Sequence, residues 1–342
     1  MSTSLDEAVE AVEAGSDLDR EQAAAALSVI MAGEADEDQV RRLLLGLREK
    51  GETSEELAGM AETMRSLASP VRPQREDLLD TCGTGGGRQT FNISTAAALV
   101  AAGAGCAVAK HGNRSSTGLT GSADVLEELG ADLALEPEAE AQLIDETGFG
   151  FMFAPAHHAA TRYVVPVRKA LGVSTIFNLL GPLTNPAGAT RQLIGVWEPA
   201  RVEIVAEALA GLGTRHALVV SSRDGLDEIS AGSTTVACEV RGGSVQTTEL
   251  EPGGLGLQEA PVDELPGGDA RASAQVITAV LGGAGGPARE VVLANAGAAV
   301  YVCGKAGSIA EGVGLAGESI DSGAAASVLA EFARRSRELA SP

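Results

Sequence analysis

Aromatic residues are scarce in this chain of 342 residues: they make up 3% of it, although 44% of its residues are hydrophobic. A sizeable interior is still possible, but it must be built from Ala, Val, Leu and Ile. Cysteine is also rare, and the four thiols lie far apart without any C-x-x-C pair, at Cys82, Cys106, Cys238 and Cys303. Because structural disulfides belong to oxidising compartments, this spacing favours a reduced cytoplasm, and we expect a cytoplasmic protein.

Positive charge is in short supply, and lysine most of all. The chain has 25 basic residues against 47 acidic ones, a formal net charge of −22, and only four of the basic residues are lysines: Lys50, Lys110, Lys169 and Lys305. Nucleic-acid binding depends on basic patches that neutralise phosphates, so this balance argues against a nucleic-acid partner. A solvated acidic surface of this kind resembles those of proteins that work in concentrated salt, and we predict a salt-adapted protein.

No apolar run reaches the ~20 residues that a bilayer-spanning helix needs. Nor does an apolar core follow a basic segment near the first residue. We therefore expect a soluble, unexported protein without a membrane partner. The 43 glycines are spread without a collagen-like period, so they mark turns and close approaches. A length of 342 residues is long for one core and suggests two domains.

Four short amphipathic segments without an intervening strand begin the chain. Apolar residues recur at helical spacing over 5–12, and capping residues open three further segments at Asp19, Asp36 and Ser54. Pro70 and Pro73 end this unit. We predict a small α-helical domain over residues 1–72, followed by an α/β domain over residues 77–342.

Strands and helices alternate from Leu78 onward, which is typical of a mostly parallel central sheet with helices on its faces. The pattern predicts strands at 77–81, 105–109, 149–153, 192–196 and 217–221, and a hairpin with an acidic loop over 239–268. It predicts helices after Ser94, at 122–129, before Gly148, around Arg162 and Arg168, and at 201–212, 272–280, 290–302 and 324–339. Residues 171–186 form a turn-rich run.

A glycine-rich turn follows the first predicted strand: Gly83-Thr84-Gly85-Gly86-Gly87 has four glycines in five positions. Small polar residues at 90–95 then open an alanine-rich helix. Glycines let the backbone approach an anion and turn its N–H groups toward it, and the helix adds the positive end of its dipole. A Walker loop would need Lys-Ser or Lys-Thr after the last glycine, and the dinucleotide fingerprint needs a glycine where Arg88 stands, so neither fits.

A second polar block, residues 110–118, follows the next apolar run and begins Lys110-His111-Gly112-Asn113-Arg114. In a parallel sheet the two strand ends lie side by side, so both loops converge on one crevice. Lys110 and Arg114 offer positive charge to an oxygen-rich anion, and Asn113 offers a short polar contact. We therefore predict a ligand that carries several phosphates.

Five runs together closely resemble the anthranilate phosphoribosyltransferase family of the tryptophan pathway. They are Gly83-Thr84-Gly85-Gly86, the run 90–95, Lys110-His111-Gly112-Asn113-Arg114, the run 121–127 and the run 176–186. The resemblance covers nearly the whole chain and implies a small α-helical domain plus a larger α/β domain, with a homodimer joined through the helical domain. We expect helices from about 165–190 to join the helical domain in space. The implied reaction transfers a phosphoribosyl group from phosphoribosyl pyrophosphate to the amine of anthranilate and releases pyrophosphate.

The resemblance also assigns residues to roles. It places Arg168, Lys110 and Asn113 at the reaction. The positions matched to phosphoribosyl pyrophosphate are Gly83, Gly86, Gly87, Thr90, Asn92, Ile93, Ser94, Thr95, Lys110, His111, Gly112, Asn113, Arg114, Ser115, Ser116, Thr117, Gly118 and Ser122. Those matched to anthranilate are Gly83, Asn113, His111, His158, Arg168 and Pro182. Those matched to the metal are Ser94, Asp227 and Glu228, for two Mg²⁺ ions.

The metal assignment agrees with the general chemistry of Mg²⁺, which is held by one or two carboxylates plus substrate phosphates. An adjacent Asp-Glu pair is by itself usually a solvated turn, and only its motif context favours a metal role. The chain departs from the family at Gly87, where the turn usually carries an acid, and the segment to Thr90 is one residue short. Any ribose or metal role of that acid is therefore open.

Two other functions share these features. A pyrimidine nucleoside phosphorylase has the same fold class and a related phosphate loop, but Asn113-Arg114 and the run 178–186 favour the transferase. A nucleotide-sensing protein on the same scaffold would be expected to lack Arg168 or the pair Asp227 and Glu228, and all three are present.

Overall fold

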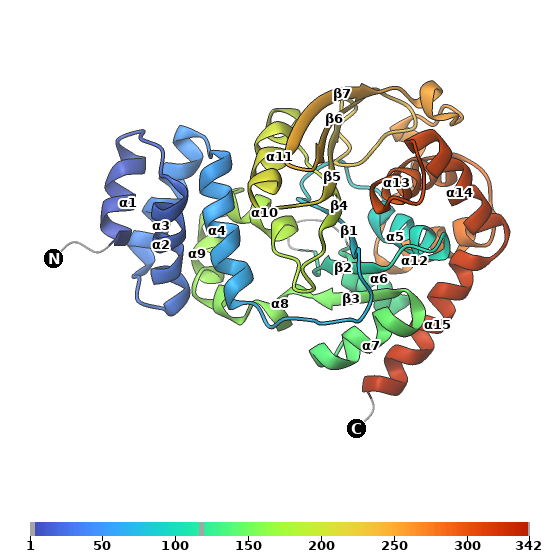
Figure 1. The fold of residues 1–342 in the computed structure, drawn as a ribbon, viewed down its shortest axis with the longest axis horizontal. Coiled ribbons are helices and arrows are strands. Elements are labelled where there is room, and N and C mark those ends of the chain that lie inside the picture. The colour runs from blue at the N-terminus through green and yellow to red at the C-terminus, as the bar shows by residue number, and fades with distance from the viewer. Residues whose placement is uncertain (1–3, 116–119, 341–342) are drawn as a thin grey trace.

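The computed structural model describes residues 4–115 and 120–340 and divides into a helical end and an α/β body (Figure 1). The helical end is built from α1 (Ser4–Glu13), α2 (Arg20–Ala32), α3 (Glu37–Lys50) and α4 (Ser54–Leu67). Asp19, Asp36 and Thr53 each cap the helix that follows with a reciprocal side-chain and backbone pair. The four predicted helices are thus confirmed.

The described residues form a seven-stranded sheet in the order β3-β2-β1-β4-β5-β6-β7. Its strands are β1 (Leu79–Gly83), β2 (Val108–Gly112), β3 (Phe149–Phe153), β4 (Arg191–Gly195), β5 (His216–Ser222), β6 (Thr235–Arg241) and β7 (Ser244–Leu250). The first five run parallel, and β6 and β7 add an antiparallel edge. The prediction of a mostly parallel sheet is confirmed.

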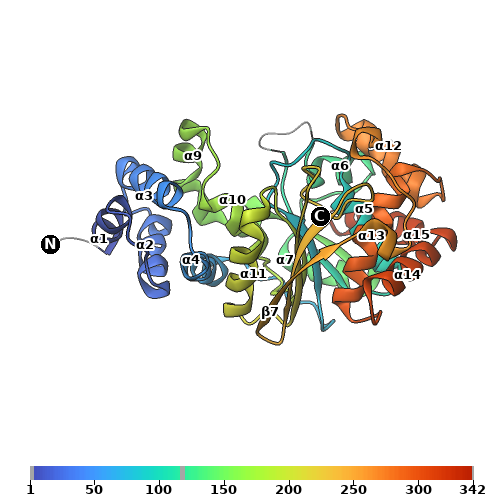
Figure 2. The same cartoon turned by 90° about the horizontal axis from the view of Figure 1, so that it is seen from above.

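Helices cover both faces of the sheet, as Figure 2 shows from above. One face carries α5 (Ile93–Gly103), α12 (Ala270–Leu281), α13 (Pro287–Cys303), α14 (Ile309–Asp321) and α15 (Ala324–Ala340). The other carries α10 (Ile176–Leu180) and α11 (Val202–Gly211), with α4 packed behind them. The strands are buried on both sides: Leu193 of β4 belongs to the first core, and its neighbour Ile194 belongs to the second.

The remaining elements connect these layers. They are α6 (Ser122–Glu128), α7 (Pro137–Thr147), α8 (Ala154–His157), α9 (Val165–Leu171) and the short 3₁₀ helices η1 (Ala159–Tyr163), η2 (Gly181–Leu183), η3 (Pro199–Arg201), η4 (Pro252–Leu255) and η5 (Val262–Glu264). None of the helices within residues 4–115 and 120–340 has the length and apolar character that a bilayer span requires.

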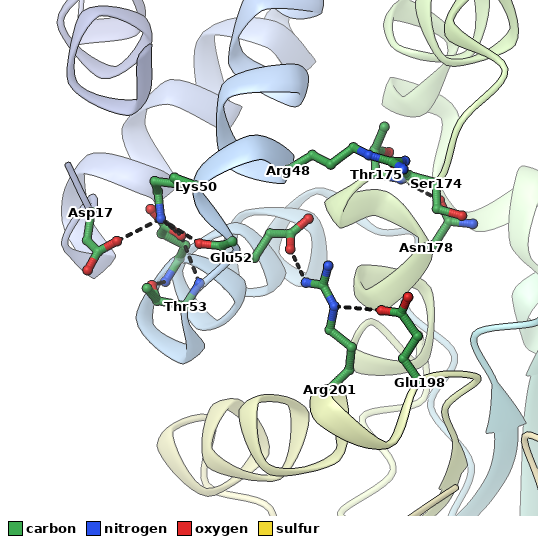
Figure 3. A network of polar contacts seen from close by, with 12 residues as sticks. Asp17, Arg48, Lys50, Glu52, Thr53, Ser174, Thr175, Asn178, Glu198 and Arg201 are labelled. Atoms are coloured by element: carbon green, nitrogen blue, oxygen red, sulfur yellow. Dashed lines mark hydrogen bonds and ion pairs between the residues drawn. The ribbon is translucent and has the colours of Figure 1, made fainter. Parts of the chain in front are cut away.

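The helical end is tied to the α/β body by packing and by charged contacts. Helix α9 packs on α3, and α10 packs on α4, so segments from the 165–190 range lie against the N-terminal helices. Figure 3 shows the polar contacts: Arg201 lies between Glu52 and Glu198, and Arg48 Nη1 donates to the Ser174 carbonyl at 2.5 Å. The domain limits 1–72 and 77–342 stay a prediction.

Three sequence predictions differ from the structure. Helix α14 is absent from the predicted helices, and it contains three glycines, at 312, 314 and 317. Those glycines allow close helix packing: a Cβ on Gly312 would lie 2.2 Å from the Gly297 carbonyl oxygen of α13. The turn-rich run 171–186 contains α10 and η2, and the hairpin begins at Thr235 of β6, four residues earlier than 239.

Candidate active site

The two predicted phosphate loops leave neighbouring strands at the same edge of the sheet. Strand β1 pairs in parallel with β2 and with β4, and the glycine-rich turn begins at Gly83, the last residue of β1. The second polar block begins inside β2, because this strand runs to Gly112 and not to the predicted residue 109. The turn ends where α5 begins at Ile93. The prediction that both loops converge is therefore confirmed by the sheet order.

Lys110 lies at the centre of this edge. Its side chain is 1% exposed, and its Nζ donates to the Thr81 carbonyl and, at 3.2 Å, to the Ser94 hydroxyl. Burial lowers the pKa of Lys110, while the charges of Asp80 and Glu228 oppose that change. The ammonium group thus links the ends of β1 and β2 to the first turn of α5.

A second buried link at this edge was missed from the sequence. The Asp80 carboxylate is buried, and it accepts hydrogen bonds from the His111 backbone N–H at 3.1 Å and from Asn185 Nδ2 at 2.8 Å. Asn185 Nδ2 also donates to the Ala109 carbonyl at 2.8 Å. An acid inside an otherwise apolar strand was the available signal, because such a group needs partners when it is buried.

The proposed metal ligands come together beside Lys110. Asp227 and Glu228 are half-buried, and the Ser94 N–H hydrogen-bonds the Glu228 carboxylate. Burial and the charge of Asp227 raise the pKa of Glu228 to about 8, and burial raises the pKa of Asp227. Two neighbouring carboxylates are oxygen donors of the kind that a hard divalent cation prefers.

The carboxylate pair does not form a metal cage alone. No group of three or more His, Cys, Asp or Glu side chains suited to a metal is found within the described ranges 4–115 and 120–340. The donor set therefore fits an ion such as Mg²⁺ that completes its coordination with substrate phosphates and water.

The glycine-rich turn lies directly against Asp227. A Cβ on Gly87 would be 2.6 Å from Asp227 Oδ1, and one on Gly83 would be 3.3 Å from Oδ2. The departure from the family at Gly87 thus has a physical consequence: an acidic side chain there would meet the Asp227 carboxylate. Gly86 lies against the ring of Trp197, with a Cβ position 3.4 Å from its Cγ.

The start of α5 divides into accessible and buried positions. Thr90, Asn92 and Ser94 are partly exposed, whereas Ile93 and Thr95 are buried. Asn92 Oδ1 accepts a hydrogen bond from Ser273 at 2.9 Å. The side chains of Ile93 and Thr95 face the core, so only their backbones are available to a phosphate.

The second loop is braced by α6. Arg114 forms ion pairs with Asp124 at 3.0 Å and with Glu127 at 2.5 Å, and its guanidinium lies 5.5 Å from the Phe153 ring centroid. Its charge is therefore paired with two acids of α6, and the predicted contact of Arg114 with a phosphate stays a prediction. Asn113 is exposed, and its carbonyl accepts from Ser122 Oγ at 3.4 Å.

The other assigned positions of this loop are placed as follows. Gly112 lies against Ser122, since a Cβ there would be 2.3 Å from its hydroxyl oxygen, and the Ser115 N–H donates to Asp124 at 3.3 Å. Ser116, Thr117 and Gly118 lie outside the described residues.

Three of the residues matched to anthranilate, His111, His158 and Pro182, belong to β2 and to segments that follow β3. The rings of His111 and His158 are 5.2 Å apart, and His158 Nε2 lies 3.1 Å from the Thr184 carbonyl oxygen. Pro182, in the same short segment, is buried. His111 Nε2 is buried without a hydrogen-bond partner in the described part of the chain.

Arg168 lies on α9, and its positive charge has no acidic partner among the described residues. Its Nη2 lies 3.4 Å from Asn178 Oδ1, and its guanidinium lies 5.3 Å from the Phe177 ring centroid. Burial alone lowers the pKa of Arg168, and across residues 4–115 and 120–340 no carboxylate forms an ion pair with it. A half-buried guanidinium of this kind is suited to a carboxylate ligand.

Both histidines of the anthranilate side are neutral at ordinary pH. Burial, with the charges of the other histidines, lowers the pKa of His111 to about 3, and burial with the charge of His157 lowers the pKa of His158 to about 4. His157 differs: burial lowers its pKa, but the hydrogen bond and charge of Glu140 outweigh burial and raise it overall.

We expect acid to destabilise the fold through His111 and His158. The unfolded chain binds protons at these side chains below about pH 6.5. The folded chain binds them only near its own lowered pKa values of about 3 for His111 and about 4 for His158. Between about pH 6.5 and these values, each histidine therefore lowers the free energy of unfolding by ~1.4 kcal/mol for every pH unit of acidification. His157 has the opposite sign, and its stabilisation is lost as pH rises through its folded pKa. NMR titration of the four histidine Cε1–H signals checks this. A folded-state midpoint near 6.5 for His111 or His158 would contradict it, and the urea-unfolded chain is the control.

Comparison with known proteins identifies the family. Residues 75–326 match the model described as glycosyl transferase family, a/b domain, and residues 6–68 match the helical bundle domain of the same family. The anthranilate phosphoribosyltransferase of Rubrobacter xylanophilus is 51% identical over 98% of this chain and 98% of its own length. The crystal structure of anthranilate phosphoribosyltransferase from Thermus thermophilus superposes with a TM-score of 0.91 at 44% identity, covering 96% of this chain and 99% of that one.

A third relative was solved with ligands. The Saccharomyces cerevisiae enzyme in complex with PRPP and Mg has a TM-score of 0.87 at 27% identity and covers 98% of both chains. The predicted resemblance and the predicted fold class are both confirmed. This chain belongs to the anthranilate phosphoribosyltransferase family of glycosyl transferases.

Proposed function

We propose that the protein transfers the phosphoribosyl group of 5-phosphoribosyl 1-pyrophosphate to anthranilate, giving N-(5-phosphoribosyl)anthranilate and pyrophosphate in tryptophan biosynthesis. The observation that supports the proposal is the buried Lys110, which bonds to Thr81 of β1 and Ser94 of α5 beside the carboxylate pair Asp227 and Glu228. The similarity to enzymes of this name over nearly the whole chain supports it.

The pyrophosphate would lie in the cradle between the glycine-rich turn, Ser94 and Lys110. Backbone N–H groups of the turn and the first turn of α5 would donate to its oxygens, with Lys110 behind them as a fixed charge. Asp227, Glu228 and Ser94 would hold Mg²⁺, and we propose two ions. When bound, Mg²⁺ neutralises the charge that develops on the departing pyrophosphate.

Anthranilate would approach along His111, His158 and Pro182. Arg168 would hold its carboxylate, and Asn113 would contact it from the end of the second loop. An aniline nitrogen is neutral at pH 7, so it attacks the anomeric carbon without a strong base. The protein supplies position and charge, which is sufficient to lower the barrier of such a displacement.

We also propose that the protein is a cytoplasmic, salt-adapted homodimer joined through the helical domain. Large apolar side chains are exposed on or beside that domain, and these are Leu67, Tyr163, Val165 and Val173. The net charge of −22 supports adaptation to salt, because screening relieves self-repulsion.

The direct test follows anthranilate fluorescence in the presence of phosphoribosyl pyrophosphate and Mg²⁺, over a range of salt concentrations. We expect fluorescence to fall as the amine is ribosylated, and only when both other components are present. Phosphorolysis of thymidine or uridine without anthranilate consumption at any salt concentration would overturn the proposal in favour of a nucleoside phosphorylase.

Replacing Arg168 by Ala should raise the KM for anthranilate far more than the KM for phosphoribosyl pyrophosphate. A lost charge-assisted contact is worth ~1.5–3 kcal/mol, or roughly 10- to 150-fold. Steady-state kinetics with each substrate varied in turn measures both values. Arg162→Ala is the matched control, because Arg162 is exposed on the neighbouring turn and bonds only to Tyr163 among the contacts seen in the described residues. Equal effects of Arg168→Ala on both substrates would contradict the assigned role.

Replacing Asp227 by Asn and Glu228 by Gln together should weaken Mg²⁺ binding while leaving side-chain volume almost unchanged. We expect kcat to fall strongly and to recover in part at high Mg²⁺, because mass action repopulates a weakened site. The measurement is kcat across a Mg²⁺ titration at fixed ionic strength. A Mg²⁺ dependence equal to that of the unmodified protein would mean that these carboxylates are only surface charge.

A further inference from the structure

The glycines near Asp227 fall into two groups. Gly85 and Gly86 have φ values of 66° and 95°, a left-handed backbone that favours glycine by itself. Gly83, Gly87 and Gly195 do not have positive φ. A different cause must explain why these three positions carry no side chain.

That cause is contact with Asp227. Gly195 ends β4 directly opposite Gly83 of β1 in the parallel register, and a Cβ on Gly195 would lie 1.6 Å from the Asp227 carbonyl oxygen. No side chain fits at that distance. A Cβ on Gly87 would lie 2.6 Å from Asp227 Oδ1 and 2.9 Å from its backbone nitrogen. The backbone of Asp227 therefore rests on β4, while its carboxylate rests on the turn.

Hydrogen bonds hold the same arrangement. The Gly195 carbonyl accepts from the Thr84 N–H at 2.9 Å, which anchors the turn to the end of β4. The Gly225 carbonyl accepts from the Arg88 N–H at 3.0 Å, which anchors the other end of the turn to the loop that carries Asp227. The Gly85 N–H hydrogen-bonds the Asp227 carboxylate.

We propose that Gly83, Gly87 and Gly195 form a seat that positions Asp227, and that Gly195 is a positioning residue for the metal site although it touches no ligand. This inference rests on the proposed function and deepens it. A carboxylate that must coordinate Mg²⁺ against pyrophosphate has to be held within a fraction of an ångström. In the seat, Gly195 contacts the backbone of Asp227, while Gly83 and Gly87 contact its carboxylate. A purely structural role would affect stability alone.

The test uses two seat variants and one matched control. Gly87→Ala introduces a methyl group beside Oδ1 in a loop without demanding a new backbone conformation, and Gly195→Ala introduces one beneath the Asp227 carbonyl. Gly46→Ala is the control: its Cβ would lie 2.6 Å from Val12 Cγ2 in the helical domain, so it crowds a core of α1 and α3 remote from the seat.

Two readouts separate positioning from stability. Thermal unfolding reports the fold, and calorimetric titration of Mg²⁺ in the presence of phosphoribosyl pyrophosphate, without anthranilate, reports the metal site. Trp197, the one tryptophan of the chain, lies against Gly86 and gives a fluorescence signal for the same titration. We expect both seat variants to raise the Mg²⁺ concentration at half-saturation by on the order of 10- to 100-fold. Gly46→Ala should lower only the melting temperature.

Seat variants that fold and bind Mg²⁺ like the unmodified protein would overturn the inference. If Gly195→Ala does not fold, Gly87→Ala decides the question. An unmodified protein that binds no Mg²⁺ with phosphoribosyl pyrophosphate would overturn both the metal site and the seat. An unmodified protein that binds Mg²⁺ and this substrate but does not consume anthranilate would refute the proposed function, and the seat variants would still test the positioning role.

Discussion

The buried charge of Lys110 is the constraint on which the arrangement of this site depends. Its side chain is 1% exposed, and an ammonium group taken out of water is costly unless its N–H groups find acceptors. The acceptors come from the carbonyl of Thr81 on β1 and the hydroxyl of Ser94 on α5, while Asp80 and Glu228 add negative charge nearby. Four segments that are far apart in the sequence therefore meet around one group. The glycine-rich turn joins β1 to α5, so it is held at both of its ends by the same lysine.

The second consequence of this buried polar centre is a link between the two sides of the site. Asp80 lies on β1 beside Thr81, and it receives hydrogen bonds from the backbone of His111 and from the side chain of Asn185. His111 lies in β2 just before the second loop, whereas Asn185 ends the segment that carries Pro182. The phosphate loops and the wall beside the histidines are thus joined through a single carboxylate. Removing one partner of such a network leaves the others unsatisfied, which is why buried polar groups specify one arrangement.

Much of this architecture follows from local sequence patterns. The caps Asp19 and Asp36, the alternation of strands and helices, and the departure of two loops from adjacent parallel strands follow local or topological rules, and the structure agrees with them. The cap of α4 is Thr53, one residue before the predicted Ser54. What the sequence did not reveal depends on contacts between distant residues. The glycines of α14 resemble loop residues until their packing on α13 is seen, and Gly195 resembles any other strand-end glycine until Asp227 is placed above it. The pairing of Arg114 with Asp124 and Glu127 was also not evident, because these acids become its neighbours only when α6 folds against its loop.

The distribution of charge in the site suits the transfer that we propose. In that reaction negative charge leaves with pyrophosphate while positive character develops on the sugar, so a cation is useful on the first side and harmful beside the second. In the proposed complex, Lys110 would face the pyrophosphate and Arg168 would hold the carboxylate of the acceptor. His111 and His158 are kept neutral by burial, with pKa values lowered to about 3 and about 4. A protonated imidazole at either position would oppose the developing positive charge, and in a site of low dielectric that repulsion is strong. In the proposed reaction, burial of these two rings would keep positive charge away from the reacting carbon.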